Sequence, residues 1–523
     1  MEGKHHMKRM IAATLTLALT TAALAGCAAN AAAPTDDQNT VAAATMSNET
    51  GKTPKYVFLF IGDGMSYPQI QSTSDYLGAL NDEDYWQAQP SLDDNQGAIL
   101  DGPEYLNFMN FEGVGTAVTF DSNSFAPDSA STATSIATGH KTYSGSINVD
   151  ETGTVEYETI AEQLKAQKGY EIGVITSVNL NHATPAAFYA HQASRSSYYE
   201  IGLEMVESDF DYFAGGGLLD PTGSEGDQTD LYQLAQEAGY TVARTYAEAD
   251  AISADTDKAI IIEENLADSD AIPYEIDRTD DMWSLADYVE KGIEVLDNDT
   301  GFFMMCEGGK IDWACHANDA GSSIHDTQAL ADAVQVAIDF AAEHPDETLI
   351  LVTGDHETGG LTIGFAGTDY DTYLDLLENQ KISYAKFDSD YVASYKENKT
   401  PFEDVLSDIE ELFGLKAQGA ADDKLVLTEY EMEQLRAAYE KSVNGTAASQ
   451  YDQEEYVLYG TYEPLSVTIT HIINNKSGIS FTSYSHTGLP VAVLAEGVGA
   501  ENFSGYYDNT QIYEKMADLL NIA

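Results

Sequence analysis

Acidic and imidazole side chains follow several short apolar runs of this 523-residue sequence. These side chains are Asp63, Glu307, Asp312, His316, Asp355, His356 and His486. Carboxylate and imidazole groups in combination are typical ligands of zinc. Asp312 and His316 stand four residues apart, so both lie on one face if the segment is helical. A single Asp after a strand is often a helix cap and a single His is usually structural, so it is their joint occurrence that indicates a metal site.

Ser129 stands in a polar turn that leads into a run of small residues, and this pattern predicts the start of a helix. A hydroxyl at that position faces backbone donors and a field that favours anions. No Ser-His-Asp spacing supplies a base for this serine, but a zinc ion could activate it by lowering its pKa. On this segment alone, an Asp or Ser that only caps the helix is the competing interpretation.

Short apolar runs that end at Gly or polar residues recur between longer stretches of helical character. The runs are Tyr56 to Ile61, Ile172 to Ile175, Phe302 to Met305, Leu349 to Val352 and Val491 to Ala495. The pattern predicts an α/β fold with a doubly wound, mainly parallel central sheet flanked by helices. Ligands of such sheets bind outside the carboxyl ends of the strands, where the candidate metal ligands stand.

The pattern changes to acidic helices between about residues 367 and 484, which we interpret as a surface insertion packed on the sheet domain. One helix is predicted to begin with a capping box at Thr400, to carry Pro401 at its first position and to end at Gly414. Its apolar face is predicted to be Phe402, Val405, Leu406, Ile409, Leu412 and Phe413. A second capping box at Thr428 predicts another helix, through Tyr439.

The chain is strongly acidic, with 87 Asp and Glu against 24 Lys and Arg, a net charge of −63 and a pI near 4.1. A nucleic-acid-binding module would need the opposite charge. The 43% of hydrophobic residues is typical of a globular protein and not of a disordered acidic one. Like charges at this density repel one another, so we expect salt to stabilise the fold.

Residues 1–26 have the features of an export signal, with Lys8 and Arg9 ahead of an apolar run too short to span a membrane stably. The signal ends in Leu24-Ala25-Gly26-Cys27, which resembles a bacterial lipoprotein box. We therefore expect lipidation of Cys27, a flexible tether over residues 27–52, and an exported lipoprotein anchored to the membrane at the cell surface or in the periplasm. The alternative is an ordinary cleaved signal that happens to contain a cysteine.

Two cysteines remain beyond Cys27, and an exported protein could pair them. Cys306 ends an apolar run and Cys315 precedes a His-bearing segment. We expect two unpaired, mostly buried thiols.

Taken together, these motifs resemble those of the bacterial alkaline phosphatases. Five of them match in order between Tyr56 and Gly497, within a domain that we place at residues 53–523. The resemblance implies that Ser129 is a nucleophile that becomes phosphoserine and that Arg195 binds the phosphate. It further implies two zinc ions and one magnesium ion per chain. The implied ligands are Asp312, His316 and His486 for the first zinc, Asp63, Asp355 and His356 for the second, and Asp63, Glu307 and Thr184 for magnesium.

The activity implied by the resemblance is hydrolysis of a broad range of phosphate monoesters to an alcohol and inorganic phosphate, which would also inhibit as product. Relatives are commonly dimeric, so the chain is compatible with a homodimer. A phosphodiesterase or sulfatase of the same superfamily is the nearest rival, although sulfatases have Cys/Ser-x-Pro-x-Arg where Ala130 and Ser131 follow Ser129. A noncatalytic lipoprotein that binds phosphate or metal is the rival from another class.

The sequence departs from the best-known bacterial type at two positions beside the predicted site. Where that type has an Asp and a Lys, this chain has His182 and Trp313, as in a marine-type variant. These residues and Asp128 would flank the site without holding a metal. Because a neutral imidazole and an indole add less charge than Asp and Lys, we expect weaker product inhibition and a greater dependence on added magnesium. The alternative is that both residues only pack.

Overall fold

The computed structural model describes residues 52–82, 85, 100–445 and 450–522. All of these residues belong to one compact unit of the chain. The expected export signal, Cys27 and almost all of the tether lie outside them. No helix among the described residues is long and apolar enough to cross a bilayer.

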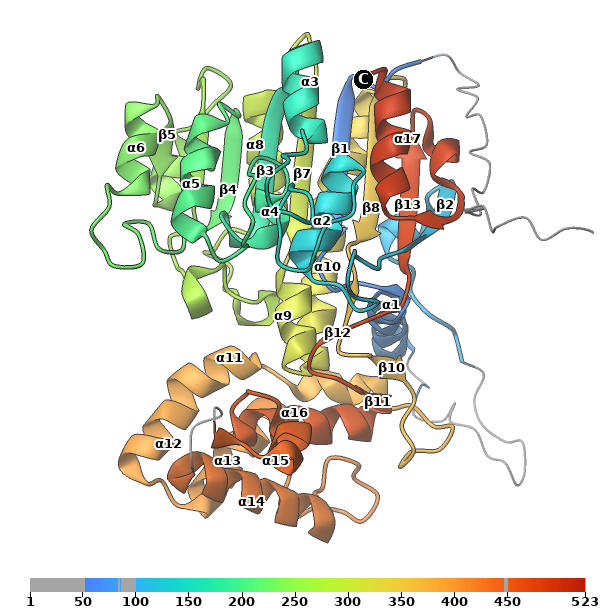
Figure 1. Cartoon of the computed structure of the whole chain (residues 1–523). Coiled ribbons are helices and arrows are strands. Elements are labelled where there is room, and N and C mark those ends of the chain that lie inside the picture. The colour runs from blue at the N-terminus through green and yellow to red at the C-terminus, as the bar shows by residue number, and fades with distance from the viewer. Residues whose placement is uncertain (1–51, 83–84, 86–99, 446–449, 523) are drawn as a thin grey trace, which may run out of the picture. The chain divides into compact units, whose positions relative to one another are not determined.

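Ten strands form one central sheet (Figure 1), in the order β14-β2-β13-β8-β1-β7-β3-β4-β6-β5. Neighbouring strands are parallel except that β13 runs antiparallel to both β2 and β8. The strands are β1 (Tyr56–Gly62), β2 (Gly113–Val118), β3 (Glu171–Asn179), β4 (Tyr212–Gly216), β5 (Thr241–Ala243), β6 (Ala259–Ile262), β7 (Phe302–Gly308), β8 (Thr348–Gly354), β13 (Val491–Gly497) and β14 (Gly505–Asp508). The five apolar runs all lie in strands, which confirms the predicted α/β sheet.

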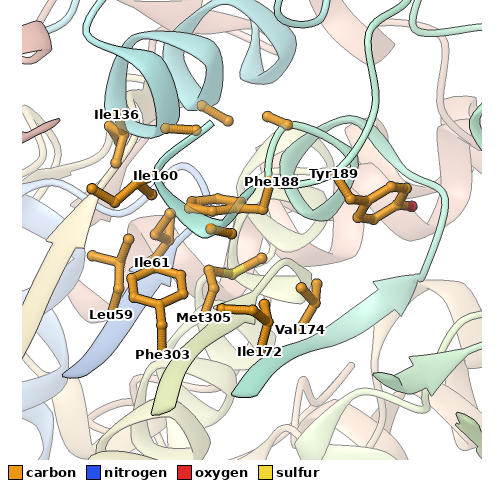
Figure 2. Close-up of a cluster of buried hydrophobic side chains, with 14 of the residues drawn as sticks. Leu59, Ile61, Ile136, Ile160, Ile172, Val174, Phe188, Tyr189, Phe303 and Met305 are labelled. Carbon is orange, nitrogen blue, oxygen red and sulfur yellow. The ribbon is translucent and has the colours of Figure 1, made fainter. Parts of the chain in front are cut away.

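Helices cover both faces of this sheet. The helices of the sheet body are α1 (Tyr67–Asn81), α2 (Ser129–Thr138), α3 (Ile160–Lys168), α4 (Ala183–Ala186), α5 (Tyr198–Glu207), α6 (Leu231–Glu237), α7 (Tyr246–Asp250), α8 (Leu285–Leu296), α9 (Lys310–His316), α10 (Ala320–Glu343) and α17 (Thr510–Leu520). Along β1 the side chains alternate between two cores, because successive residues of a strand point to opposite faces. Leu59 and Ile61 pack with Ile136 of α2 and Phe188 (Figure 2), whereas Phe58 belongs to the other core and packs against Phe340 of α10.

A helical insertion lies between two short strands, β10 (Thr362–Ile363) and β11 (Ile479–Ser480), which pair antiparallel. Its helices are α11 (Tyr384–Phe387), α12 (Ala393–Asn398), α13 (Phe402–Phe413), α14 (Glu429–Asn444), α15 (Gln453–Tyr459) and α16 (Pro464–Ser477). They share a hydrophobic cluster with α1 and α10 of the sheet body, through residues such as Tyr76 and Ile324. In Figure 1 these orange and red helices gather beside α9. The insertion therefore packs on the helices next to the predicted site.

One detail of the predicted insertion is wrong. Helix α13 begins at Phe402, and Pro401, whose backbone is extended, takes the cap position without a side-chain capping bond. Thr400 therefore stands outside the helix and forms no capping box. The predicted end at Gly414 is confirmed, since this residue adopts the left-handed conformation at φ 72°. The capping box of Thr428 with Glu431 is also confirmed, at the start of α14.

Cys306 and Cys315 are both buried and unpaired. Cys306 lies inside β7 and Cys315 in α9, where its sulfur is 3.3 Å from the Ser323 hydroxyl. The expectation of two free thiols is confirmed.

Candidate active site

The carboxyl ends of three adjacent central strands supply most of the candidate ligands. Asp63 follows β1, Glu307 lies at the end of β7, and Asp355 and His356 follow β8. Because these strands are parallel and neighbours in the order β8-β1-β7, their ends meet at one edge of the sheet. This edge is where the sequence pattern predicted the site.

His486 reaches the same place from far along the chain. It belongs to a two-residue strand, β12 (His486–Thr487), which pairs antiparallel with β9 (Glu357–Thr358) directly after Asp355 and His356. The His486 Nδ1 atom lies 2.6 Å from the carbonyl oxygen of Pro127, two residues before Ser129. This contact fixes the ring orientation and leaves Nε2 directed at the other candidate ligands.

Asp312, His316 and His486 form the first group of candidate ligands. Asp312 and His316 lie on helix α9, as their spacing predicted, with His316 Nε2 3.4 Å from Asp312 Oδ2. His486 Nε2 is 3.1 Å from His316 Nε2 and 3.6 Å from Asp312 Oδ1. The His316 Nδ1 atom lies 2.6 Å from the carbonyl oxygen of Tyr484. One carboxylate and two oriented imidazoles are a donor set that suits zinc.

Asp63, Asp355 and His356 form the second group, and all three are fully buried. His356 Nε2 is 3.3 Å from Asp63 Oδ1 and 3.3 Å from Asp355 Oδ2. The ligand atoms of this group lie within 4.8 Å of one another, and so do those of Asp312, His356 and His486. His356 therefore stands between the two groups, with its ring stacked on that of His486 at 3.7 Å between centroids.

Glu307 and Thr184 extend the second group. The Thr184 hydroxyl donates to Asp63 Oδ2 at 3.2 Å, and Thr176 donates to Glu307 Oε2. Asp63, Glu307 and Thr184 are all buried. Two carboxylates and a hydroxyl provide the oxygen-rich donor set that magnesium prefers.

The buried carboxylates repel one another. Burial and the charges of Asp355 and Asp312 raise the pKa of Asp63. Burial and the charge of Asp355 raise the pKa of Glu307 to about 7, although hydrogen bonds partly oppose them. Among the described residues, Asp63 Oδ1 and Glu307 Oε1 are buried and make no hydrogen bond. Mutually repelling carboxylates with unpartnered oxygens fit bound cations, which would neutralise the charge and satisfy these atoms.

Two of the three candidate histidine ligands are in the neutral form that binds metal. Burial lowers the pKa of His356 to about 4 and that of His486 to about 4. His316 differs, because the charge and hydrogen bond of Asp312 outweigh burial and raise its pKa to about 9. A metal ion on this group would therefore displace a proton from His316.

Ser129 is the first residue of helix α2, as the sequence predicted, and Asp128 is its N-cap. The Ser129 hydroxyl oxygen lies 3.1 Å from His356 Nε2, beside the second group of ligands. The Asp128 side chain accepts hydrogen bonds from the backbone N–H groups of Ser131 and Gly145. Ser129 is thus both part of a capped helix start and in contact with a candidate metal ligand.

Arg195 is mostly buried and pairs with Asp128, at 2.8 Å between Nη1 and Oδ2. Burial opposes the charge of Arg195, but Asp128 outweighs burial and raises the pKa of the guanidinium. The Nη2 atom of Arg195 is 3.3 Å from His182 Nε2. Burial and the charge of Arg195 lower the pKa of His182 to about 3, so its imidazole is neutral. Asp128 and His182 together set the position of the guanidinium.

Sequence reasoning missed two side chains that contact residues of this site, Thr358 and Lys310. The Thr358 hydroxyl donates to Asp312 Oδ1 at 2.5 Å and lies 3.3 Å from His356 Nδ1, so it contacts both groups of ligands. Lys310 is fully buried, with its ammonium group 2.7 Å from Asp268 and 4.5 Å from the centre of the Trp313 ring. Neither residue has a distinctive motif, although Thr358 closely follows Asp355 and His356 in the sequence.

A cavity of about 330 Å³ connects the site to solvent. Its lining residues are Ser129, His182, Arg195, Asp268, Ser269, Asp312, Trp313, His316, Tyr384, Tyr462 and His486. A serine hydroxyl, a guanidinium and one group of candidate metal ligands therefore face the same space. This arrangement can bind a tetrahedral anion and attack it with the serine oxygen.

Comparisons with known proteins show what the chain is similar to. The family model described as alkaline phosphatase matches residues 54–522. Alkaline phosphatase 3 of Bacillus subtilis is 30% identical over 469 residues, which cover 88% of this chain and 87% of that protein. A cold-active alkaline phosphatase from a Shewanella species superposes with a TM-score of 0.68 at 30% identity, covering 89% of this chain and 99% of that one.

A second similar structure is a variant of the alkaline phosphatase from the Antarctic bacterium TAB5. It is 26% identical, with a TM-score of 0.58, and covers 90% of this chain and 99% of that one. In that variant a histidine is replaced by aspartate, and Mg is bound in the M3 site.

Proposed function

Because the chain belongs to the alkaline phosphatase family, whose members hydrolyse phosphate monoesters, we propose that it does so through a phosphoserine at Ser129 in a site for two zinc ions and one magnesium ion. The observation that carries this proposal is the placement of Ser129, Arg195 and one group of candidate metal ligands around one cavity. Ser129 also contacts His356 of the other group at 3.1 Å.

Asp312, His316 and His486 would hold one zinc ion, and Asp63, Asp355 and His356 the other. Asp63, Glu307 and Thr184 would hold magnesium. When bound, these cations would supply Lewis-acid charge that lowers the pKa of the serine and of water and balances charge on the departing oxygen. The fit rests on the unpartnered oxygens of Asp63 and Glu307 and on the neutral state of His356 and His486.

Ser129 performs the first half of the reaction. Its oxygen loses a proton and forms a bond to phosphorus while the bond between phosphorus and the alcohol oxygen breaks. The departing oxygen gains a proton, so the products are phosphoserine and the alcohol. Water then attacks phosphorus, the bond to the serine oxygen breaks, and inorganic phosphate and free Ser129 result. The first turn of α2 favours this chemistry, because a helix N-terminus stabilises negative charge.

Arg195 orients the phosphoryl group. A guanidinium can donate two parallel hydrogen bonds to two nonbridging oxygens, which fixes the group and offsets its charge. The ion pair with Asp128 holds the guanidinium at the cavity wall before substrate arrives. Because inorganic phosphate offers the same oxygens to Arg195, it should act as a product inhibitor.

The competing activities of the superfamily fit this chain less well. A diesterase generally lacks the third-metal Glu and the phosphate-binding Arg, and this chain has Glu307 and Arg195 at its site. The sulfatase pattern requires a Pro two residues after the nucleophile, where this chain has Ser131. A noncatalytic binding protein would not need a serine at 3.1 Å from a candidate metal ligand.

His182 and Trp313 support an enzyme that binds phosphate and magnesium more weakly than the type with Asp and Lys at these positions. His182 is neutral and contacts Arg195, so it adds no charge to the phosphate site. The TAB5 variant binds Mg in its M3 site after a histidine is replaced by aspartate, which is the exchange that we expect to strengthen magnesium binding at His182. We further propose, from the lipoprotein box at Cys27, that the protein is exported and anchored to a membrane through lipid.

Phosphate release from a monoester, a diester and a sulfate ester tests the activity directly. The metal-loaded protein should hydrolyse the monoester fastest and lose this activity in excess chelator, given time for exchange. Readdition of zinc and magnesium should restore it. Faster turnover of the diester or the sulfate ester would assign the chain to a rival activity, and full activity in chelator would refute the metal site.

A further inference from the structure

Two tyrosines of the helical insertion line the cavity that contains Ser129. Tyr384 lies on α11 and Tyr462 stands two residues before the start of α16, and both are partly exposed and line the cavity. Neither belongs to the two groups of candidate metal ligands, and neither carries a charge like that of the Arg195 guanidinium. The proposed reaction uses neither of them, although they line the same space as the nucleophile.

These aromatic rings are held in fixed positions. The Tyr384 and Tyr462 rings meet edge to face, with centroids 5.8 Å apart and planes at 82°. Tyr274 packs behind Tyr384 at 5.8 Å and donates a hydrogen bond from its hydroxyl to that of Tyr384 at 3.3 Å. The backbone N–H of Tyr384 donates to the buried Asp319 at 3.0 Å. The rings of Tyr384 and Tyr462 therefore form a rigid surface, called the wall below. A rigid surface loses little conformational entropy when a substrate binds to it.

The wall lies on the side from which the alcohol departs. In an in-line displacement the leaving oxygen moves away from the nucleophile, and Ser129 contacts the second group of ligands through His356. The first group, with Asp312 and His316, faces the same cavity as the tyrosines. Tyr462 lines this cavity together with Asp312 and His316 of that group. The organic part of a bound substrate would point toward Tyr462.

The charges around the wall favour a neutral organic group. Of the residues that line this cavity in the described structure, Arg195 is the one with a permanent positive charge, and it pairs with Asp128. The Asp268 carboxylate is paired with buried Lys310 at 2.7 Å. The same ammonium lies 4.5 Å from the centre of the Trp313 ring, which makes this indole a poor partner for a second cation.

We propose that Tyr384 and Tyr462 bind the organic group of the substrate and make the enzyme prefer phosphate monoesters of arylmethyl and aryl alcohols over those of short alkyl alcohols. This inference rests on the proposed function, because it assumes attack by Ser129. Tyrosine faces and edges attract aromatic rings in stacked or edge-to-face contact, beyond the benefit of burying apolar area.

Three phosphates with alkyl alcohol leaving groups test the preference: benzyl, cyclohexylmethyl and ethyl phosphate. The wild-type kcat/KM should be highest for benzyl phosphate. In Tyr462→Leu the value for benzyl phosphate should fall about tenfold and that for ethyl phosphate less than about twofold, because only the larger group reaches the ring. Tyr462→Phe keeps the ring and should keep the preference.

A control and a binding measurement separate this role from a structural one. Tyr430→Leu removes an exposed tyrosine of α14, also in the insertion, and should leave all three values unchanged. Calorimetric titration with benzylphosphonate and ethylphosphonate should show weaker binding of the benzyl compound alone in Tyr462→Leu.

The possible outcomes distinguish a failure of this inference from a failure of the proposed function. Equal losses for all three phosphates in Tyr462→Leu would overturn the inference, and equal losses for benzyl and cyclohexylmethyl phosphate would overturn its aromatic part. A larger loss for phosphocholine than for benzyl phosphate would show that the wall recognises a cation instead. Failure of the wild type to hydrolyse any monoester would refute the proposed function itself.

Discussion

Glu307 is buried among other carboxylates, and this placement makes the stability of the metal-free protein depend on pH. The pKa of Glu307 is about 7 in the folded protein against 4.5 for the free side chain, because burial and Asp355 disfavour its charge. The protonated form thus stabilises the fold below about pH 4.5, and this contribution is lost as the pH rises through about 7.

Glu307→Gln should remove that pH dependence. Between pH 5 and 8 the metal-free wild type should lose on the order of 3 kcal/mol of unfolding free energy relative to the variant, since Gln stays neutral. Denaturant unfolding of chelator-treated proteins measures the difference. With zinc and magnesium present the wild type should instead be more stable than the variant, because the Glu307 carboxylate then binds a cation. Parallel pH profiles of the two metal-free proteins would contradict the electrostatic account of this site.

His182 and Trp313 give a second prediction at the level of single residues. His182→Asp with Trp313→Lys should strengthen phosphate inhibition and lower the magnesium concentration needed for half-maximal activity, each by about tenfold. The added Lys attracts bound phosphate and the added Asp attracts magnesium or its waters. The phosphate inhibition constant and the magnesium activation curve decide the matter. If neither changes, the two residues only pack against Arg195 and Lys310.

Asp63, Glu307, Asp355 and His356 could be predicted from the sequence because they stand at the ends of apolar runs, and parallel strands bring these ends together. The residues that surround these ligands could not be predicted in this way. Lys310 is hidden beneath Trp313 by the fold of α9, and Tyr462 reaches the cavity from an insertion more than a hundred residues beyond Asp312. Such contacts depend on tertiary packing, which no local spacing encodes.

At the scale of elements, two similar sequence patterns led to different structures. Thr428 caps α14, with its hydroxyl accepting from the Glu431 N–H at 3.2 Å. Thr400 does not cap α13, because Pro401 is extended and itself occupies the cap position. A Ser or Thr three residues before Glu therefore predicts that a helix is near, but a proline between them can move its start.

The two threonines provide a matched pair of variants. Thr428→Ala should lower the unfolding free energy by about 1 kcal/mol, because it leaves an N–H of the first turn of α14 without its partner. Thr400→Ala should change it by less than about 0.5 kcal/mol, as for most substitutions away from such features. Denaturant unfolding measures both values, and kcat should stay constant. An equal effect of the two variants would contradict the assigned caps.

At the scale of the sheet, the apolar runs predicted the five strands β1, β3, β7, β8 and β13. The other five strands, β2, β4, β5, β6 and β14, were not predicted. Strands β4 and β6 are buried along their whole length and were missed all the same. Strand β5 has only three residues, and β2 and β14 carry exposed side chains such as Val114 and Tyr506. Strands that are short or half exposed lack the continuous apolar run that marks a buried parallel strand.

The whole molecule carries a net charge of −63, and this charge predicts how salt affects it. Screening shortens the range of repulsion to about 3 Å at 1 M salt, so the folded state should gain stability. We expect the melting temperature to rise by at least about 3 °C between low and molar NaCl. Sucrose, which does not screen charge, serves as the control for general solvent effects. A melting temperature that is independent of NaCl would contradict this expectation.

The central claim is that phosphate monoesters are hydrolysed through a phosphoserine at Ser129. Trapping of this covalent intermediate tests the claim most directly, because it identifies both the chemistry and the residue that performs it. Metal-loaded wild type mixed with labelled phosphate monoester and quenched in acid should carry phosphate on the peptide that contains Ser129. Ser129→Ala should carry no label, bind zinc and magnesium nearly as well, and turn over at least about a thousandfold more slowly. Labelling of both proteins at the same residue, or full turnover by the variant, would place the nucleophile elsewhere and contradict the account.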